Sequence, residues 1–300
     1  MAIRLYDDIR PHFRGELREN EPMSRHTSLR VGGPADLFAV PADTEDLLTL
    51  IRWLDGRGIP HLTRGGGYNL LVRDGGIRGA VISLERFTRI EQVGPGLIRA
   101  EAGAENLAVV RFAQERGLGG IGFIAGIPGT VGGAVRMNAG AYGEGILGHT
   151  ECLTLLRGSE VRDFCMADLE YGYRHLELEP GDLVLAALFR LEGREPHHTE
   201  AEIRKDLELR RAKHNVGFPS AGSFFKNPPG GAAWRLIDAA GMRGMTVGGA
   251  QVSEVHSNFL VNRGGATARD FLELAGRVKA AVLEQSGVVL EEEVRIVGEE

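Results

Sequence analysis

The 300-residue sequence shows neither the pattern of a membrane-spanning helix nor that of a signal peptide, so we expect neither in this protein. No apolar run approaches the roughly 20 residues that a transmembrane helix needs. Residues 1–15 are charged and contain no apolar core, so we expect no signal peptide. The sequence therefore predicts a cytoplasmic protein with no membrane partner.

Basic runs and cysteine motifs are also missing. Lysine and arginine total 35 against 41 acidic residues, a net charge of −6, which argues against a nucleic-acid partner. The two cysteines, Cys152 and Cys165, have neither CxxC spacing nor histidines nearby, so we expect buried thiols. The adjacent His197 and His198 have no evident third ligand, and we expect no metal site.

Several common catalytic motifs are absent. The sequence has no G-x-S-x-G elbow, no H-E-x-x-H, and no glycine loop that ends in Gly-Lys-Ser/Thr. Residues 117–122 do match the dinucleotide pattern G-x-G-x-x-G. That pattern must follow a strand, whereas this copy follows a predicted helix at 105–116, so a Rossmann fold is rejected.

Glycine is the abundant residue, with 43 copies, about twice the usual share. Seven of them fall in the stretch 122–143, which has almost no large polar side chain. Such a segment exposes main-chain N–H groups, and successive N–H groups can surround a phosphate. We predict a cofactor-binding segment here, with a run of tight turns as the alternative.

The order of predicted elements favours an α+β fold in two domains. The expected helices lie within 1–20, from the N-cap Asp43 to Gly56, and at 105–116, 200–214, 233–240 and 267–285, with a short helix or turn at 168–174. The expected strands lie at 38–40, 60–63, 80–84, 97–102, 150–156, 161–165, 183–191, 259–262 and 288–297.

Taken singly, the residues that could carry chemistry have ordinary structural interpretations. Arg174 would form a surface salt bridge, and Ser223 would occupy a turn. Lys213 would be one charge on a solvated helix, and Glu293 one member of an acidic run. None of them alone indicates catalysis.

Eight motifs that occur in one order change this interpretation. They resemble the UDP-N-acetylenolpyruvoylglucosamine reductase (MurB) family over about residues 20–298. The motifs are RVGGPAD (30–36), GGGYNLLV (65–72), GIPGTVGGA (126–134), MNAGAYG (137–143), YR (173–174), AGSFFKNP (221–228), HSNF (256–259) and LEEEVR (290–295).

The resemblance implies a vanillyl-alcohol-oxidase/PCMH-type FAD-binding domain at residues 1–198, made of two α+β subdomains that divide near residue 85. A C-terminal α+β substrate-binding domain at 199–300 would follow, with its last strand returning to the active site. The short segment 193–200 leaves no room for an inserted tyrosine-loop lobe, so the chain resembles the shorter type of the family. The resemblance also leads us to expect a monomer.

The implied activity is an oxidoreductase reaction of peptidoglycan precursor synthesis, with FAD and NADPH as cofactors. A hydride passes from NADPH to the flavin and then to the enolpyruvyl double bond of the UDP-sugar, which gives UDP-N-acetylmuramate. The resemblance places FAD against three segments. They contain Gly65, Gly66, Gly67, Asn69 and Leu70; Gly126, Ile127, Pro128, Gly129, Thr130, Gly132 and Gly133; and Asn138, Ala139, Gly140 and Ala141.

Three residues match the catalytic positions of the family. Arg174 would hold the substrate carboxylate, and Ser223 would donate the proton to the enolate. Glu293 would bond as a neutral acid, with its pKa raised by burial and like charge. The expected substrate contacts are Tyr173, Lys213, Asn227 and Asn258.

Two positions depart from the family pattern, which often has serine where this chain has Tyr68 and Leu176. Two other classes of function also stay open. One is a UDP-sugar transferase whose glycine loops bind phosphates alone, and the other is a non-catalytic nucleotide-binding module. A bound flavin would exclude the transferase, and tolerance to loss of the three catalytic residues would indicate the module.

Overall fold

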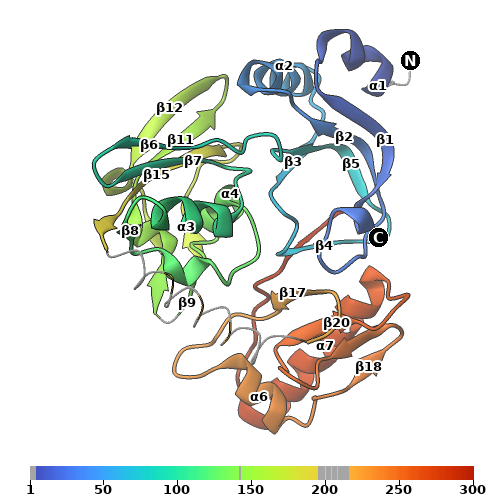
Figure 1. Ribbon diagram of the computed structural model, residues 1–300. Helices are drawn as coiled ribbons and strands as arrows, with labels where there is room; N and C mark the ends of the chain where they lie inside the picture. The colour runs from blue at the N-terminus through green and yellow to red at the C-terminus, as the bar shows by residue number, and fades with distance from the viewer. Residues whose placement is uncertain (1–4, 142, 195–199, 201–203, 205–207, 209–215) are drawn as a thin grey trace. The chain divides into compact units, whose positions relative to one another are not determined.

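The computed structural model describes residues 5–141, 143–194, 200, 204, 208 and 216–300 (Figure 1). Its chain divides into two compact units. Unit 1 comprises residues 1–18, 38–66 and 81–210, and unit 2 comprises residues 19–37, 67–80 and 211–300. The predicted domains group residues 19–37 and 67–80 with the N-terminal part, and the domain boundary near 198 stays a prediction.

Local signals in the sequence account for the longer helices. The Asp43 side chain caps α2 (Thr44–Asp55) by accepting a hydrogen bond from the Asp46 N–H, as predicted. A reciprocal capping box of Thr267 and Asp270 begins α7 (Ala268–Ser286), and Gly287 ends it with a φ of 72°. The other described helices are α1 (Leu5–Ile9), α3 (Asn106–Gln114), α4 (Val131–Arg136), α6 (Ala233–Ala239), and the 3₁₀ helices η1 (Arg10–His12), η2 (Met23–Arg25), η3 (Gly122–Ile124), η4 (Ile146–His149) and η5 (Met166–Asp168). In the described part of the chain, no helix is long and apolar enough to span a bilayer.

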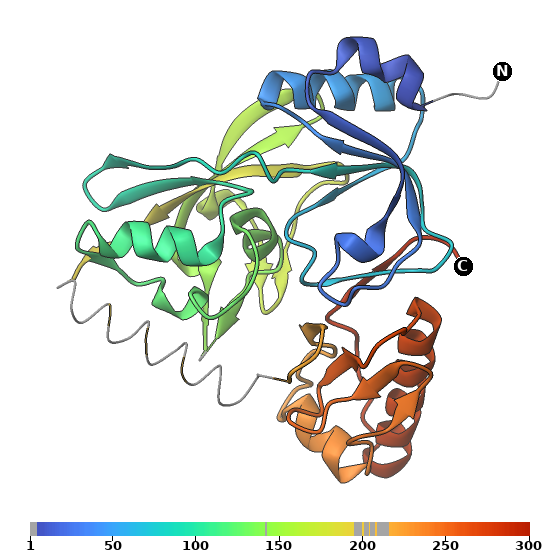
Figure 2. The same cartoon turned by 45° about the vertical axis from the view of Figure 1, so that its right-hand side comes forward.

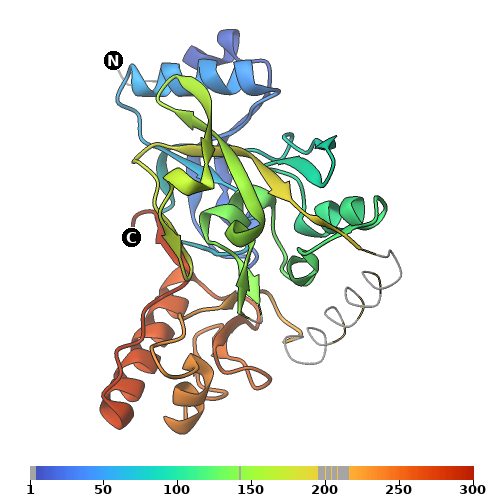
Figure 3. The ribbon, with the colours of Figure 1, turned by 90° about the vertical axis from the view of Figure 1, so that its left-hand side faces the viewer.

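Unit 1 is built around a five-stranded antiparallel sheet with the order β12-β11-β15-β7-β6. Helix α4 packs against β15 and β7, and buries Val131 and Val135 in the same core as Phe189 of β15. The turn between β11 and β12 lies beside α2, where Arg52 donates to the Ser159 carbonyl over 3.5 Å (Figure 3). The strands are β6 (Ile90–Gly94), β7 (Leu97–Glu101), β11 (Thr150–Arg157), β12 (Glu160–Cys165) and β15 (Leu183–Arg190).

The remaining N-terminal strands form a second sheet and short pairs. The second sheet has the order β1-β2-β5-β3. Its strands are β1 (Glu16–Pro22), β2 (Pro34–Val40), β3 (His61–Arg64) and β5 (Ile77–Ser83). The short pairs are β8 (Leu118–Gly119) with β16 (Glu192–Gly193), β9 (Gly140–Ala141) with β10 (Glu144–Gly145), and β13 (Tyr171–Gly172) with β14 (His175–Leu176).

Unit 2 contains a four-stranded antiparallel sheet with the order β17-β20-β19-β18. Helix α7 packs against β18 and β19 and lies beside α6 (Figure 2). Asp74 accepts hydrogen bonds from the first two N–H groups of α7, at 2.9 and 3.0 Å. The strands are β17 (Ser220–Ser223), β18 (Thr246–Val247), β19 (Ala250–Val252) and β20 (Phe259–Asn262), and β21 (Arg295–Val297) pairs in parallel with β4 (Leu70–Val72).

Two predicted elements are wrong in type or length. Among the described residues of the helix expected within 1–20, those from Leu5 to His12 are helical, whereas residues from Glu16 onward join the β1-β2 sheet. Residues 168–174, expected as a short helix or turn, contain the end of η5, the strand β13 and the turn at Tyr173 and Arg174 that leads into β14. The closing strand is shorter than 288–297, because residues 291–293 hydrogen-bond to the segment 224–226. The helix expected at 200–214 falls almost wholly outside the described residues.

The prediction of two buried thiols is wrong. Cys152 and Cys165 face each other across β11 and β12 with their Sγ atoms 3.2 Å apart. Cys165 is exposed because β12 is the edge strand of its sheet, and Cys152 is half-buried. Burial, together with the neighbouring Cys165 thiol, raises the pKa of Cys152 to about 11.

Candidate active site

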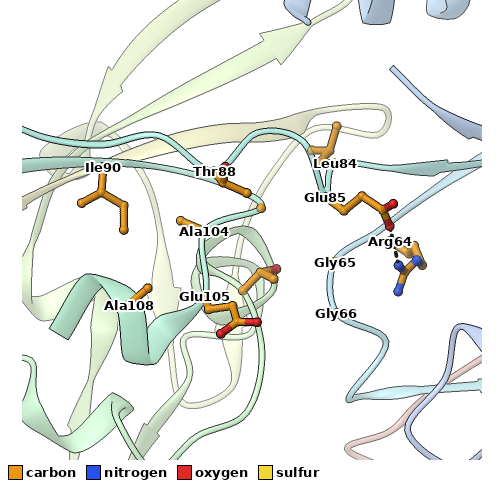
Figure 4. Close-up of a pocket in the computed structure, with 12 residues that line it drawn as sticks. Arg64, Gly65, Gly66, Leu84, Glu85, Thr88, Ile90, Ala104, Glu105 and Ala108 are labelled. Carbon is orange, nitrogen blue, oxygen red and sulfur yellow. Dashed lines mark hydrogen bonds and ion pairs between the residues drawn. The ribbon is translucent and has the colours of Figure 1, made fainter. Parts of the chain in front are cut away.

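A cavity of about 360 Å³ opens in unit 1 where four segments of the chain meet (Figure 4). Gly65 and Gly66, which follow β3, lie on one side of it. Ala104 and Glu105, which precede α3, lie on the other side. The remaining lining residues are Arg64, Leu84, Glu85, Thr88, Ile90, Gly103, Ala108 and Thr130.

This cavity brings together two of the predicted flavin loops. Gly65 belongs to the first loop and Thr130 to the second. A Cβ atom at position 65 would lie 2.8 Å from Thr130 Oγ1, so a side chain there would force the Thr130 hydroxyl to move. Residues 65 and 66 therefore meet Thr130 at one cavity, although they lie 65 and 64 positions before it in the chain.

The cavity has polar groups that fit the pyrophosphate of FAD. The Oγ1 atom of Thr130 is buried and has no hydrogen-bond partner among the described residues. Such a group costs about 1–3 kcal/mol, so its presence favours a ligand that accepts its hydrogen bond. The Arg64 side chain is 10% exposed and pairs with Glu85 over 3.3 Å, which adds a fixed cation to the same wall. A hydroxyl, a guanidinium and bare main chain at Gly65 are the groups that recognise phosphate.

Asn106 is a residue of this region that the sequence analysis missed. Its Nδ2 donates to the Ile127 carbonyl over 3.0 Å, and its main-chain N–H donates to the Gly129 carbonyl over 3.1 Å. Only 1% of Asn106 is exposed, and its Oδ1 has no partner in the described ranges. Asn106 therefore holds the second glycine loop against the first turn of α3. The sequence did not indicate this role, because a polar residue at the start of a helix is usually a cap.

Part of the second glycine loop is used inside the fold. The N–H groups of Val131 and Gly132 donate to the carbonyls of Ala104 and Ala102, each over 2.9 Å. A Cβ atom at Gly132 would lie 2.9 Å from the Ala102 Cβ, so close packing accounts for this glycine. These two N–H groups are therefore not available to bind a phosphate. Fewer main-chain groups of the motif can contact the cofactor than its length suggests. Flavin contact by the rest of the loop stays a prediction for Gly126, Ile127, Pro128, Gly129 and Gly133.

Arg174 occupies the turn of the β13-β14 hairpin in unit 1. Its φ of 55° is unusual for a residue with a long side chain. Its guanidinium donates to the carbonyls of Asn138 and Gly140, over 3.4 and 3.2 Å, and lies 5.3 Å from the Tyr173 ring centre. The 58% exposed Tyr173 and the half-buried Arg174 therefore sit beside the segment 138–141 that is predicted to support the flavin ring.

Ser223 ends β17 in unit 2 at a bulge. Ser220 pairs with Val261 and Ser223 with Phe259, so β17 has one more residue than β20 between these pairs. Gly222, with a φ of 76°, provides the conformation that the extra residue requires. A bulge interrupts the alternation of side chains between the two faces of a strand. This bulge therefore changes the face to which the Ser223 side chain points.

Glu293 lies on the segment next to Ser223. The Glu293 N–H donates to the carbonyl of Phe224 over 2.8 Å, and Phe225 forms a bridge with Glu292. The Glu293 carbonyl accepts from Asn69 Nδ2 over 3.0 Å. Two of the predicted catalytic residues therefore lie on adjacent stretches of main chain within unit 2.

The other two acidic residues of this run have lysine partners. Lys226 lies 3.3 Å from a carboxylate oxygen of Glu291, and Lys279 lies 2.8 Å from one of Glu292. These pairs give Glu291 and Glu292 structural roles. Glu293 is the member of the run that matches the glutamate of the family motif, and its catalytic role stays a prediction.

Two predicted substrate contacts have structural partners instead. Asn258 is 2% exposed; its Nδ2 donates to the Phe225 carbonyl over 2.8 Å, and its Oδ1 accepts from the Phe225 N–H over 3.0 Å. Asn227 Oδ1 accepts from the N–H of Ala233 at the start of α6. Both amides hold the main chain around Ser223, so direct substrate contact is not needed to explain them.

The remaining predicted residues are placed as follows. Lys213 lies outside the described residues. Arg174 belongs to unit 1, whereas Ser223 and Glu293 belong to unit 2. The grouping of all three catalytic residues therefore stays a prediction. The first flavin loop is likewise divided, with Gly65 and Gly66 in unit 1 and the stretch 67–70 in unit 2.

The two departures from the family pattern lie in different environments. Tyr68 is 46% exposed, so its ring replaces a serine without disturbing a core. The Leu176 side chain is fully buried in the core of unit 1, and its carbonyl accepts from Arg136 over 2.7 Å. A serine at 176 would place a hydroxyl in this core.

Comparisons with family models match both parts of the chain. Residues 35–159 match a model described as an FAD binding domain, and residues 213–297 match the C-terminal domain of UDP-N-acetylenolpyruvoylglucosamine reductase. Together with the mixed helices and strands described above, they confirm the predicted α+β fold class with an FAD-binding domain followed by a C-terminal domain.

Curated relatives and a solved structure match almost the whole chain. The UDP-N-acetylenolpyruvoylglucosamine reductase of Pelobacter propionicus is 74% identical over 96% of this chain and 98% of its own length. The reductase of Geobacter sulfurreducens is 52% identical over the full length of both. The crystal structure of UDP-N-acetylenolpyruvylglucosamine reductase (MurB) from Thermus caldophilus matches with a TM-score of 0.81 and 33% identity, over 94% of this chain and 98% of that one.

Proposed function

The chain belongs to the UDP-N-acetylenolpyruvoylglucosamine reductase family, and from this premise we propose the reaction it catalyses and the residues that carry it. The protein is an FAD- and NADPH-dependent oxidoreductase that reduces the enolpyruvyl group of UDP-N-acetylenolpyruvoylglucosamine to give UDP-N-acetylmuramate. The predicted family, oxidoreductase class, flavin cofactor and small-molecule substrate agree with the relatives and the FAD-binding match.

When bound, FAD supplies the hydride chemistry, so the protein must provide position, charge and one proton. The pyrophosphate would be held at the unit 1 cavity by Thr130, Arg64 and the main chain of Gly65. The unpartnered Thr130 hydroxyl supports this assignment.

Arg174 would bind the substrate carboxylate. Reduction of the double bond leaves negative charge next to that carboxylate, and a fixed guanidinium stabilises it. The carbonyls of Asn138 and Gly140 accept hydrogen bonds from the guanidinium. They hold it in place before the substrate binds, so substrate binding requires less loss of side-chain entropy.

Ser223 would give its proton to the enolate carbon, and Glu293 would donate a hydrogen bond to the developing charge as a neutral acid. Serine is a weak acid in water, but an enolate is basic enough to take its proton. The observation that supports these roles most is the main-chain bond from Glu293 to Phe224, which holds the two residues on neighbouring segments.

The purified protein tests this function. It should be yellow, NADPH should bleach it, and the enolpyruvyl sugar nucleotide should restore the colour. Colourless protein that takes up no FAD would contradict the proposal and favour the UDP-sugar transferase. Flavin that is bound but never bleached by NADPH would favour the non-catalytic module. The monomeric state and the cytoplasmic location stay predictions.

A further inference from the structure

Asn138 lies at the centre of several hydrogen bonds in unit 1. Its Nδ2 donates to the Gly172 carbonyl over 2.8 Å, and its Oδ1 accepts from the Leu147 N–H over 3.2 Å. Its main-chain carbonyl accepts from Arg174 Nη1 over 3.4 Å. One residue thus joins the turn after α4 to η4 and to the β13-β14 hairpin.

The same turn holds the hairpin at two further points. Arg136 donates to the Leu176 carbonyl over 2.7 Å, and the Gly140 carbonyl accepts from Arg174 Nη2 over 3.2 Å. Arg174 and Asn138 both have positive φ, 55° and 40°. That conformation is unfavourable for arginine, so contacts with its surroundings must offset its cost.

We propose that Asn138 is the positioning residue of Arg174, which rests on the proposed function because it concerns the arginine assigned to the substrate carboxylate. The sequence resemblance assigned Asn138 to flavin contact instead. Both polar atoms of its side chain are already engaged within the protein, at Gly172 and Leu147. Its effect on the reaction therefore passes through the hairpin, and a displaced guanidinium binds the carboxylate in the wrong place.

Gly145 offers a way to displace the Asn138 amide without changing it. A Cβ atom at position 145 would lie 2.5 Å from Asn138 Oδ1 and 3.1 Å from its Nδ2. The φ of Gly145 is −130°, which alanine adopts without strain, so only the amide opposes Gly145→Ala. Gly148, three residues away, has open space around it, and Gly148→Ala is the matched control.

The structural part of the proposal is tested by hydrogen exchange of the FAD-bound protein. Asn138→Gly keeps the left-handed conformation and removes both side-chain bonds. This variant and Gly145→Ala should speed amide exchange in residues 171–176 at least tenfold, whereas Gly148→Ala should not. Unchanged exchange in both variants would overturn the proposal whatever the reaction proves to be.

The functional part is tested by rapid mixing of the two half-reactions. Asn138→Gly and Gly145→Ala should keep the flavin spectrum and its reduction by NADPH within about twofold, and should slow transfer to the enolpyruvyl sugar about 10–100-fold. In an Arg174→Lys background, Asn138→Gly should cost less than a further twofold. Equal slowing of both half-reactions, or full additivity, would overturn the proposal. A wild-type enzyme that is bleached by NADPH but not reoxidised by the sugar would contradict the proposed function alone, and hydrogen exchange would still decide the role of Asn138.

Discussion

The side-chain amide of Asn69 donates a 3.0 Å hydrogen bond to the main-chain carbonyl of Glu293, 224 positions further along the chain. The Arg295 N–H returns a bond of 3.1 Å to the Asn69 carbonyl, and β4 and β21 continue the pairing from there. Asn69, which belongs to the predicted flavin loop, therefore also holds the main chain of Glu293, the proposed neutral acid.

Asn69→Ala should slow transfer to the enolpyruvyl sugar about tenfold per bound flavin, because Glu293 loses one of its two main-chain anchors. Rapid mixing of the reduced enzyme with the sugar measures this rate. Tyr68→Ala, in the same loop and 46% exposed, is the control and should keep the rate. A loss of FAD content with an unchanged rate per flavin would show that Asn69 contacts only the cofactor.

Ser223→Ala should leave the reduction of flavin by NADPH nearly intact and lower transfer to the sugar at least 100-fold, because only the second half-reaction needs a proton from the protein. Stopped-flow absorbance of the flavin separates the two steps. Ser220→Ala, on the same strand, should have little effect on either. If the Ser223 variant slows both steps equally, the residue has a structural role.

Thr130→Val should weaken FAD binding about tenfold, because the FAD phosphate loses the hydrogen bond that we assign to the buried Thr130 hydroxyl. Equilibrium binding of FAD to the apoprotein measures the change. Thr130→Ser keeps the hydroxyl and should bind within about threefold of wild type. Equal loss in both variants would assign the effect to packing of the methyl group.

Asn258→Ala should destabilise the protein by about 2–4 kcal/mol, because it leaves the buried N–H and carbonyl of Phe225 without partners. Urea unfolding of the flavin-free protein measures this. Asn227→Ala removes one bond at an exposed position and should cost about 1 kcal/mol or less. A stable Asn258→Ala protein with a raised KM for the sugar would instead support the original prediction of substrate contact.

The pKa of the Cys152 thiol, raised to about 11 by burial and by Cys165, gives a prediction about reactivity. Only the thiolate reacts with iodoacetamide, so alkylation of Cys152 should rise with pH up to that value. Cys165→Ala removes a hydrogen bond and a negative charge that favour the neutral thiol, and should move the profile to lower pH. An unchanged profile would contradict the role of Cys165 and leave burial and the charges of Glu151 and Asp163 as the causes of the raised pKa.

Local signals predicted most of the fold. The capping residues Asp43 and Thr267 fixed the starts of α2 and α7, because a side chain that accepts from a nearby N–H acts over three residues. Alternation of polar and apolar residues likewise located β7 and the β11-β12 hairpin. The prediction failed where a segment distant in sequence determines the local structure. Glu16–Pro22 forms a strand because it pairs with β2.

The site was predictable where motifs carried it and not where single residues did. The glycine motifs at 65–72 and 126–134 singled out two segments that meet at the cavity through Gly65, Gly66 and Thr130, and flavin binding by these segments stays a prediction. Nothing marked Asn106, whose partners at 127 and 129 lie on another segment. The reciprocal bonds of Asn258 with Phe225 were also unmarked, because they depend on a contact between residues 33 positions apart; its contact with substrate stays a prediction.

The fit between Gly145 and the Asn138 amide has a consequence for sequence divergence. A larger residue at 145 is tolerable only after 138 has lost its amide, and an asparagine regained at 138 would then find its space taken. The two positions should thus co-vary among homologues, and the order in which they mutate should be constrained. Ancestral reconstruction would show whether position 138 always lost its asparagine before position 145 gained a larger residue.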